Sequence, residues 1–316
     1  MRKDITAVRR RKIRAARLSI LSNTGLTVAK LGVGISSGSV SVLSEAAHSA
    51  NDLAAAIIAY LAVRVADQPA DDEHPYGHGK AESFSALFEA SLILLAAAYI
   101  AYEAITRLFN DPRHIETGSG IAVMALSVVV NIAVSRHLFQ VAGETDSLAL
   151  RADAEHLRTD VLTSAGVIVG LGLVYLTGWG GFDSIAAAAV AGMICAAAIR
   201  LIRDAIQGLM DVRLPEPDLQ KVVGVLDASP EVLAYHKLRS RKSGSYRHID
   251  AHILVSDQLS FVEAHALTER LEDSIRQALP RTEVILHTEP YAVEVKHQHD
   301  EHGGPKPPAS TVSGVH

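Results

Sequence analysis

Residues 43–53 read Leu43-Ser44-Glu45-Ala46-Ala47-His48-Ser49-Ala50-Asn51-Asp52-Leu53. Their spacing of carboxylate, imidazole and carboxylate recurs further along the chain at Asp153, His156 and Asp160. Positions i, i+3 and i+7 lie on one face of an α-helix. Both triplets sit in apolar stretches long enough to enter a bilayer, where carboxylates are expensive and usually mark an ion pathway. The repeat therefore predicts a polar site between two membrane-spanning helices.

The two triplets, turned toward each other, would form one site for a divalent metal. We expect its four ligands to be His48, Asp52, His156 and Asp160. Neutral imidazole and carboxylate suit Zn²⁺, which prefers tetrahedral geometry, and the two aspartates would neutralise one divalent ion. Glu45 and Asp153 lie almost two helical turns from the aspartates, so we expect supporting or pathway roles for them. Two unrelated polar patches in a bundle are the alternative, and the duplication argues against them.

Apolar residues make up 48% of the 316 residues, and the long apolar stretches lie almost entirely between residues 18 and 206. Each candidate span approaches the ~20 residues that a helix needs to cross the hydrocarbon core. Six spans are predicted, at residues 16–37, 40–65, 82–107, 117–140, 147–176 and 182–206. Lys30, Glu89 and Asn131 interrupt them, which a bundle with a polar interior tolerates.

Six spans would place both termini on the same side of the membrane. Basic residues cluster before the first span, and the positive-inside rule then makes both termini cytoplasmic. We expect a multi-pass protein of the inner (cytoplasmic) membrane. Its four predicted parts are a basic cytoplasmic N-terminus at residues 1–15, a six-span domain at 16–210, a cytoplasmic metal-binding and dimerisation domain at 211–293, and a disordered, histidine-containing tail at 294–316. The net charge of −5 argues against a nucleic-acid partner, and a single cysteine excludes an internal disulfide framework.

Residues 211–293 read as a small soluble domain. Helices are predicted at residues 219–228 and 261–279, and strands at 233–239, 248–255 and 282–287. Residues 242–246, Lys-Ser-Gly-Ser-Tyr, are typical of a hairpin turn between the first two strands. The expected fold class is an α-helical membrane bundle of six transmembrane helices, followed by a metallochaperone-like α+β domain of order α-β-β-α-β.

Two further groups of metal-binding residue types lie outside the triplets. Asp71, His74 and His78 have metal-ligand spacing in a compact loop, although spacing alone is equally compatible with a solvated loop whose histidines titrate. In the soluble domain the candidates are scattered in sequence, and they are His236, His252, His265, His287 and Glu289. Surface histidines of a small α+β domain are the alternative there.

The chain resembles the cation diffusion facilitator family in more than its triplets. Residues 43–53 and 152–170 look like the family's two metal-site segments, and residues 68–82, QPADDEHPYGHGKAE, are close to the family signature. Together with the six spans and the soluble domain, the resemblance covers roughly residues 15–292. It implies a homodimeric metal/proton antiporter.

The resemblance also implies roles for individual residues. It places the intramembrane transport site on His48, Asp52, His156 and Asp160. It places a peripheral zinc site on Asp71, His74 and His78. A metal cluster near the dimer interface would be formed by His236, His252, His287 and Glu289, with His265 as a weaker candidate. The resemblance further implies a salt bridge between Lys80 and Asp211 that interlocks the membrane and soluble halves, with ordinary surface charges as an equally favoured alternative. Histidine on both spans resembles the zinc-preferring branch, whereas Glu45 departs from the aspartate common at its position.

We therefore predict a divalent metal efflux transporter that exchanges Zn²⁺ for protons by alternating access, with zinc also as a structural or regulatory ion. Fe²⁺, Co²⁺ and Cd²⁺ are the alternatives for the transported ion, because the affinity of nitrogen and oxygen ligands for divalent metals follows a general order. A non-transporting, membrane-anchored metal sensor or scaffold is the rival, but it has no need of two triplets. A membrane metalloenzyme would need a motif such as His-Glu-x-x-His, which the chain lacks, so we expect no enzyme.

Overall fold

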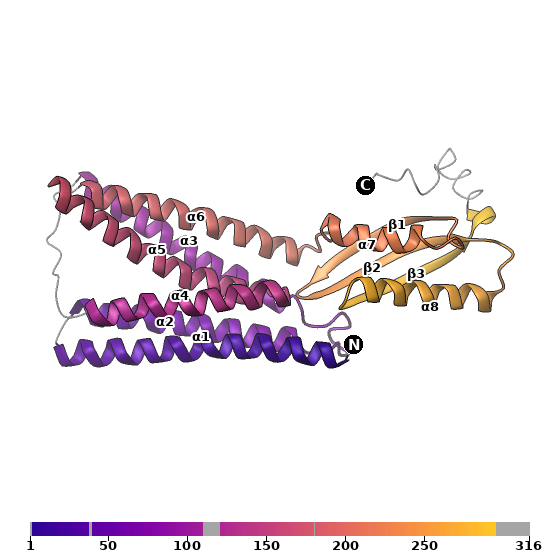
Figure 1. The fold of residues 1–316 in the computed structure, drawn as a ribbon, viewed down its shortest axis with the longest axis horizontal. Coiled ribbons are helices and arrows are strands. Elements are labelled where there is room, and N and C mark those ends of the chain that lie inside the picture. Colours follow the sequence, from indigo (N-terminus) through magenta and orange to yellow (C-terminus); the bar gives the residue numbers. More distant parts are fainter. Residues whose placement is uncertain (1, 38–39, 110–120, 180, 295–316) are drawn as a thin grey trace. The chain divides into compact units, whose positions relative to one another are not determined.

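The computed structural model describes residues 2–37, 40–109, 121–179 and 181–294. The chain divides into two compact units, Met1–Met210 and Asp211–His316. The first unit holds the long helices labelled α1 to α6 in Figure 1, which are α1 Arg2–Ser37, α2 Val40–Ala66, α3 Ala81–Phe109, α4 Ile121–Thr145, α5 Leu148–Thr177 and α6 Gly181–Leu209. All six are long and apolar enough to cross a membrane, which confirms the six predicted spans.

Two of these helices extend past the predicted spans. α1 begins at Arg2 rather than at residue 16, so the basic N-terminal segment is helical, and arginine and lysine are indeed good helix formers. α4 continues to Thr145 rather than ending at residue 140. The predicted start of the fourth span at residue 117, and the turn expected before it, lie outside the described residues.

Lys12, in the basic part of α1, is completely buried. Its Nζ donates to Asp67 Oδ1 at 2.6 Å and to Glu82 Oε1 at 2.9 Å. Glu82 Oε2 accepts a hydrogen bond from Ser147 Oγ at 2.6 Å, and Ser147 is the N-cap of α5. Because a buried ammonium is costly unless it is paired, this network ties α1, α3 and α5 to one another.

Small residues line the contacts between the membrane helices and let them approach closely. α3 and α6 meet at a cluster that includes Ala86 and Ala205, both fully buried. At Gly166 of α5, a Cβ atom would lie only 2.6 Å from Cγ2 of Val190 on α6, so a larger residue would force the Val190 side chain or the helices themselves to shift. Large apolar side chains such as Ile168 are exposed instead, as expected for a surface that faces lipid.

The second unit contains α7 Glu216–Asp227, β1 Ala234–Ser243, β2 Tyr246–Val255, α8 Phe261–Ala278 and β3 Thr282–Pro290. This order confirms the predicted α-β-β-α-β domain. β1 and β2 form an antiparallel hairpin, and Gly244 in its turn has a φ of +58°, in the left-handed region that favours glycine. β3 pairs with β2 in parallel, which the crossover through α8 makes possible.

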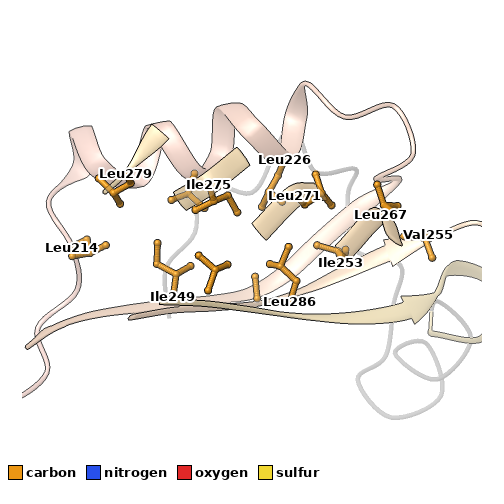
Figure 2. Packing of buried hydrophobic residues seen from close by; sticks show 13 residues of the cluster. Leu214, Leu226, Ile249, Ile253, Val255, Leu267, Leu271, Ile275, Leu279 and Leu286 are labelled. Carbon is orange, nitrogen blue, oxygen red and sulfur yellow. The ribbon is translucent and has the colours of Figure 1, made fainter. Parts of the chain in front are cut away.

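Helices α7 and α8 pack on the same face of this sheet, and Figure 2 shows the side chains that fill the space between the helices and the strands. Ile253 of β2 and Leu286 of β3 are buried there with Leu271 of α8. Successive side chains of a strand point to opposite faces. His252 and His287, each adjacent in sequence to one of these core residues, therefore point to the face that the helices leave open.

Candidate metal centres

The two helices that carry the polar triplets, α2 and α5, pack against each other. α2 contributes His48 and Asp52, and α5 contributes His156 and Asp160, each pair one helical turn apart. Nε2 of His156 lies 3.0 Å from Oδ1 of Asp52. Nε2 of His48 lies 3.6 Å from Oδ1 of Asp160 and 3.8 Å from Oδ1 of Asp52. The structure thus brings the four residues predicted as transport ligands together across one helix pair.

We call these four residues the α2/α5 site. Ligand atoms of His48, Asp52 and Asp160 all lie within 4.8 Å of one another, and His156 joins them through its contact with Asp52. The Asp52 side chain is only 7% exposed, whereas that of His48 is 53% exposed, so the site has a buried side and an accessible side. Two nitrogen donors, two carboxylates and two negative charges form a donor set that suits one divalent cation.

The first carboxylate of each triplet contacts α1. Glu45 Oε2 accepts a hydrogen bond from Lys30 Nζ at 3.2 Å, and the same ammonium donates to Ser49 Oγ at 2.8 Å. Asp153 is fully buried and accepts a hydrogen bond from Ser19. Their supporting role stays a prediction, but the structure gives both carboxylates partners outside the α2/α5 site.

Glu89 on α3 is a buried carboxylate to which sequence reasoning assigned no role. It is 2% exposed, and neither of its carboxylate oxygens has a hydrogen-bond partner among the described residues. It interacts electrostatically with Asp153 and His156 of α5. Burial of a polar group without a hydrogen bond is costly, and such residues inside membrane spans are commonly functional. Its signal in the sequence was an acidic residue well inside the apolar span at residues 82–107.

The loop between α2 and α3 gathers Asp71, His74 and His78. Asp71 Oδ1 accepts a hydrogen bond from the backbone N–H of His74 at 2.7 Å and lies 3.2 Å from Nδ1 of the His74 ring. The other carboxylate oxygen, Oδ2, lies 3.4 Å from His78 Nε2. Gly77, with a φ of +79°, turns the chain between the two histidines, whose ring centroids are 4.3 Å apart. The backbone hydrogen bond from His74 lowers the pKa of Asp71, which keeps this carboxylate charged and available to a cation.

In the second unit, three histidines lie side by side across the sheet. The register pairs His236 of β1 with His252 of β2, and His252 with His287 of β3. Ring centroids are 5.1 Å apart in the first pair and 4.8 Å apart in the second. Glu289 of β3 joins the row, because its Oε1 lies 2.7 Å from His252 Nδ1 and its Oε2 lies 3.3 Å from His236 Nε2. We call these four residues the sheet cluster.

The members of the sheet cluster are not equally close to one another. Ligand atoms of His236, His252 and Glu289 lie within 4.8 Å of one another, and His287 Nε2 lies 3.5 Å from Glu289 Oε1. Burial lowers the pKa of His236, which favours the neutral imidazole that binds metal. His265 on α8 is largely exposed and lies 3.6 Å from Glu269, although it lines a pocket of about 420 Å³ together with His287 and Glu289.

The predicted salt bridge between Lys80 and Asp211 would link the two units, and it stays a prediction. Within the first unit, Lys80 Nζ donates to the backbone carbonyl of Leu209 at 3.1 Å. Within the second, Asp211 Oδ1 lies 3.5 Å from Nη1 of Arg241. The histidines of the predicted tail, beyond residue 294, lie outside the described residues.

Two models of known protein families match the chain along most of its length. A cation efflux transmembrane domain matches residues 16–210, and the cytoplasmic domain of cation efflux proteins matches residues 214–291. The chain belongs to the cation diffusion facilitator family. This cation diffusion facilitator is therefore a multi-pass membrane protein and a cation efflux transporter.

Individual relatives of this cation diffusion facilitator match over both units. An uncharacterized transporter of Synechocystis sp. is 37% identical over 281 residues, which span 88% of this chain and 90% of that protein. The cation-efflux pump FieF of Citrobacter koseri is 36% identical over 256 residues, or 81% of this chain and 85% of that pump. Among solved structures, the metal-bound C-terminal domain of the CzcD transporter from Thermotoga maritima is 27% identical, covers 24% of this chain and 94% of that domain, and has a TM-score of 0.23.

Proposed function

We propose that this transporter exchanges Zn²⁺ for protons, with Zn²⁺ bound as substrate at the α2/α5 site. The contact of His156 with Asp52 carries the proposal, because it joins the imidazole and carboxylate donors of α2 and α5 inside membrane-spanning helices. Four nitrogen and oxygen ligands favour Zn²⁺. The two aspartates balance both charges of the ion, so the loaded site is neutral. Fe²⁺, Co²⁺ and Cd²⁺ are the rival ions.

Proton exchange follows from the chemistry of the ligands. A metal ion binds to deprotonated imidazole and carboxylate, so its arrival releases protons. Histidine titrates near neutral pH, and His48 and His156 can therefore bind protons again when the ion leaves. Exposure of the α2/α5 site to one side of the membrane and then to the other would couple zinc efflux to proton entry.

We further propose that the loop residues and the sheet cluster hold zinc as a resident ion. Asp71, His74 and His78 provide two nitrogen donors and a charged carboxylate, and the sheet cluster provides three imidazoles and Glu289. Both donor sets suit Zn²⁺. Resident zinc at the sheet cluster would stabilise a homodimer and shift the balance between transport states. Both termini would lie in the cytoplasm, with the protein in the inner membrane.

Zinc uptake into lipid vesicles tests the assignment of the α2/α5 site. The purified full-length protein is placed in vesicles that contain a zinc-sensitive dye, and Asp160→Asn is compared with Glu155→Gln. Both changes remove one carboxylate charge from α5, but Glu155 pairs with Arg158 on another face of the helix. We expect Asp160→Asn to abolish zinc uptake and Glu155→Gln to retain it. Uptake at the parent rate by Asp160→Asn would show that the transport site is wrongly assigned.

A further inference from the structure

Lys30 is a buried cation of α1 that binds the helix carrying half of the transport ligands. The residue is 6% exposed, and its Nζ lies 2.8 Å from Ser49 Oγ and 3.2 Å from Glu45 Oε2. Both acceptors belong to α2, and His48 lies between them in sequence. Glu45 also interacts electrostatically with His48. The ammonium thus contacts the immediate surroundings of the α2/α5 site without belonging to its ligand set.

A lysine inside a membrane span is expensive, and such residues generally serve a function. The pairing with Glu45 offsets part of this cost, but two apolar side chains of similar size would fill the same space without any desolvation cost. Stability alone therefore does not explain why the pair is present. The position of Glu45 relative to the metal ligands offers an explanation.

Glu45 is placed to become an additional metal ligand. It precedes His48 by three positions and Asp52 by seven, so the three side chains share one face of α2. Its side chain is 39% exposed, against 7% for Lys30, so the carboxylate has room to turn. A free Glu45 would add a third negative charge to those of Asp52 and Asp160, which exceeds the charge of one divalent ion. The bond to Lys30 engages Glu45 and cancels this extra charge.

We propose that Lys30 determines metal specificity by holding Glu45 away from the α2/α5 site, which keeps that site at four ligands. The inference rests on the proposed function, because it takes the α2/α5 site as the place where the transported ion binds. Four nitrogen and oxygen donors suit Zn²⁺, whereas Mn²⁺ prefers six ligands and carboxylate oxygen. Lys30 thereby selects against Mn²⁺, although it touches no metal itself.

Competition between Mn²⁺ and Zn²⁺ in vesicles tests this proposal. Lys30→Gln removes the charge but can still donate a hydrogen bond to Ser49, and Lys30→Met serves as a second neutral variant if Lys30→Gln does not fold. We expect either variant to raise Mn²⁺ transport relative to Zn²⁺ by about tenfold, the scale of effects from groups that orient metal ligands. Lys30→Arg keeps the positive charge and should retain the parent ratio. An unchanged ratio in a folded neutral variant overturns the proposal.

The double variant K30Q/E45Q separates an effect through Glu45 from a direct effect of Lys30. Glutamine at position 45 keeps the shape of the side chain but binds metal poorly, so the double variant should regain the parent selectivity. If it keeps the altered ratio of Lys30→Gln, Lys30 does not act through Glu45 and the proposal is wrong. A parent protein that moves no zinc would instead contradict the proposed function itself.

The visible absorption of bound Co²⁺ gives a readout that does not depend on transport. Four-coordinate Co²⁺ absorbs far more strongly than Co²⁺ with five or six ligands. The parent spectrum is subtracted from the Lys30→Gln spectrum, both recorded in detergent. The absorption of all unchanged metal sites cancels, so the difference reports only the site that changes. We expect weaker absorption in Lys30→Gln and recovery in K30Q/E45Q. Identical spectra for all three proteins would contradict the proposal.

Discussion

Nε2 of His156 on α5 lies 3.0 Å from Oδ1 of Asp52 on α2, and this contact joins the two halves of the proposed transport site. Asp52 is also 3.8 Å from His48, so one carboxylate touches an imidazole on each helix. Asp52 is the most buried of the four residues. The α2/α5 site therefore depends on Asp52 more than on any other single side chain.

Replacement of this carboxylate is expected to weaken zinc binding strongly. Asp52→Asn keeps the side-chain volume but removes a charge and a ligand, so zinc affinity should fall by at least about 100-fold, more than the loss of an outer-shell partner usually costs. Isothermal titration of zinc into the full-length protein in detergent measures this change, which should appear as the loss of one zinc site relative to the parent. Asp204→Asn on α6, which removes an exposed carboxylate bound to Arg151, is the control and should leave all sites intact. Equal titrations of the two variants would argue against Asp52 as a ligand.

The imidazole of His48 should set the preference for zinc over cadmium. His48→Asp replaces a neutral nitrogen donor with a carboxylate that can bind through both oxygens and that admits larger ions. The ratio of Cd²⁺ to Zn²⁺ transport in vesicles should therefore rise. We expect a rise of about tenfold if His48 dominates the selection between the two ions. His137→Asp makes the same substitution at an exposed position of α4, and its ratio should equal that of the parent. If His48→Asp also gives the parent ratio, the selectivity argument fails.

Asp71 should be essential for metal binding in the loop between α2 and α3. Its carboxylate contacts both His74 and His78, and its lowered pKa keeps it charged. Asp71→Asn should therefore abolish the zinc-dependent protection of residues 68–80 against hydrogen exchange. Asp72→Asn removes the neighbouring exposed carboxylate and serves as the matched control. Zinc-dependent protection that persists in Asp71→Asn would show that the loop does not use this residue as a ligand.

The sheet cluster should stabilise the strands that carry it when zinc is present. A ligand at 100 times its Kd stabilises the native state by about 2.7 kcal/mol. Hydrogen exchange of β2 and β3 in the full-length protein should slow accordingly on addition of zinc, and His252→Ala should remove this effect. His265→Ala is the control, because His265 pairs with Glu269 outside the cluster. If His265→Ala loses the zinc-dependent protection while His252→Ala keeps it, then His265 rather than His252 is the ligand.

The sequence predicted well the membrane helices and the placement of each His/Asp pair on one helix face, because both depend on local patterns. A bilayer requires long apolar segments, and i, i+4 pairs such as His48 with Asp52 share a helix face regardless of the rest of the fold. The loop residues Asp71 and His74 were predictable for the same reason. Their spacing within one short segment is enough to bring them together, and the structure does so.

Contacts between distant segments that no repeated pattern marks could not be read from the sequence. The row of His236, His252 and His287 depends on the register of three strands, one of which pairs only after a crossover through α8. The bond between Lys30 and Glu45 depends on the rotation of α1 and α2 about their axes. The same holds for Lys12, which reads as a surface charge of a basic segment but is buried by residues far along the chain.

The most direct test of the account is the simultaneous measurement of zinc and proton flux in vesicles that hold the purified protein with a zinc dye and a pH dye inside. An inward zinc gradient should drive zinc into the lumen and protons out, so the lumen should become alkaline as zinc enters. Asp160→Asn should abolish both signals together. Zinc entry by the parent protein with no change in luminal pH would contradict proton exchange at the α2/α5 site.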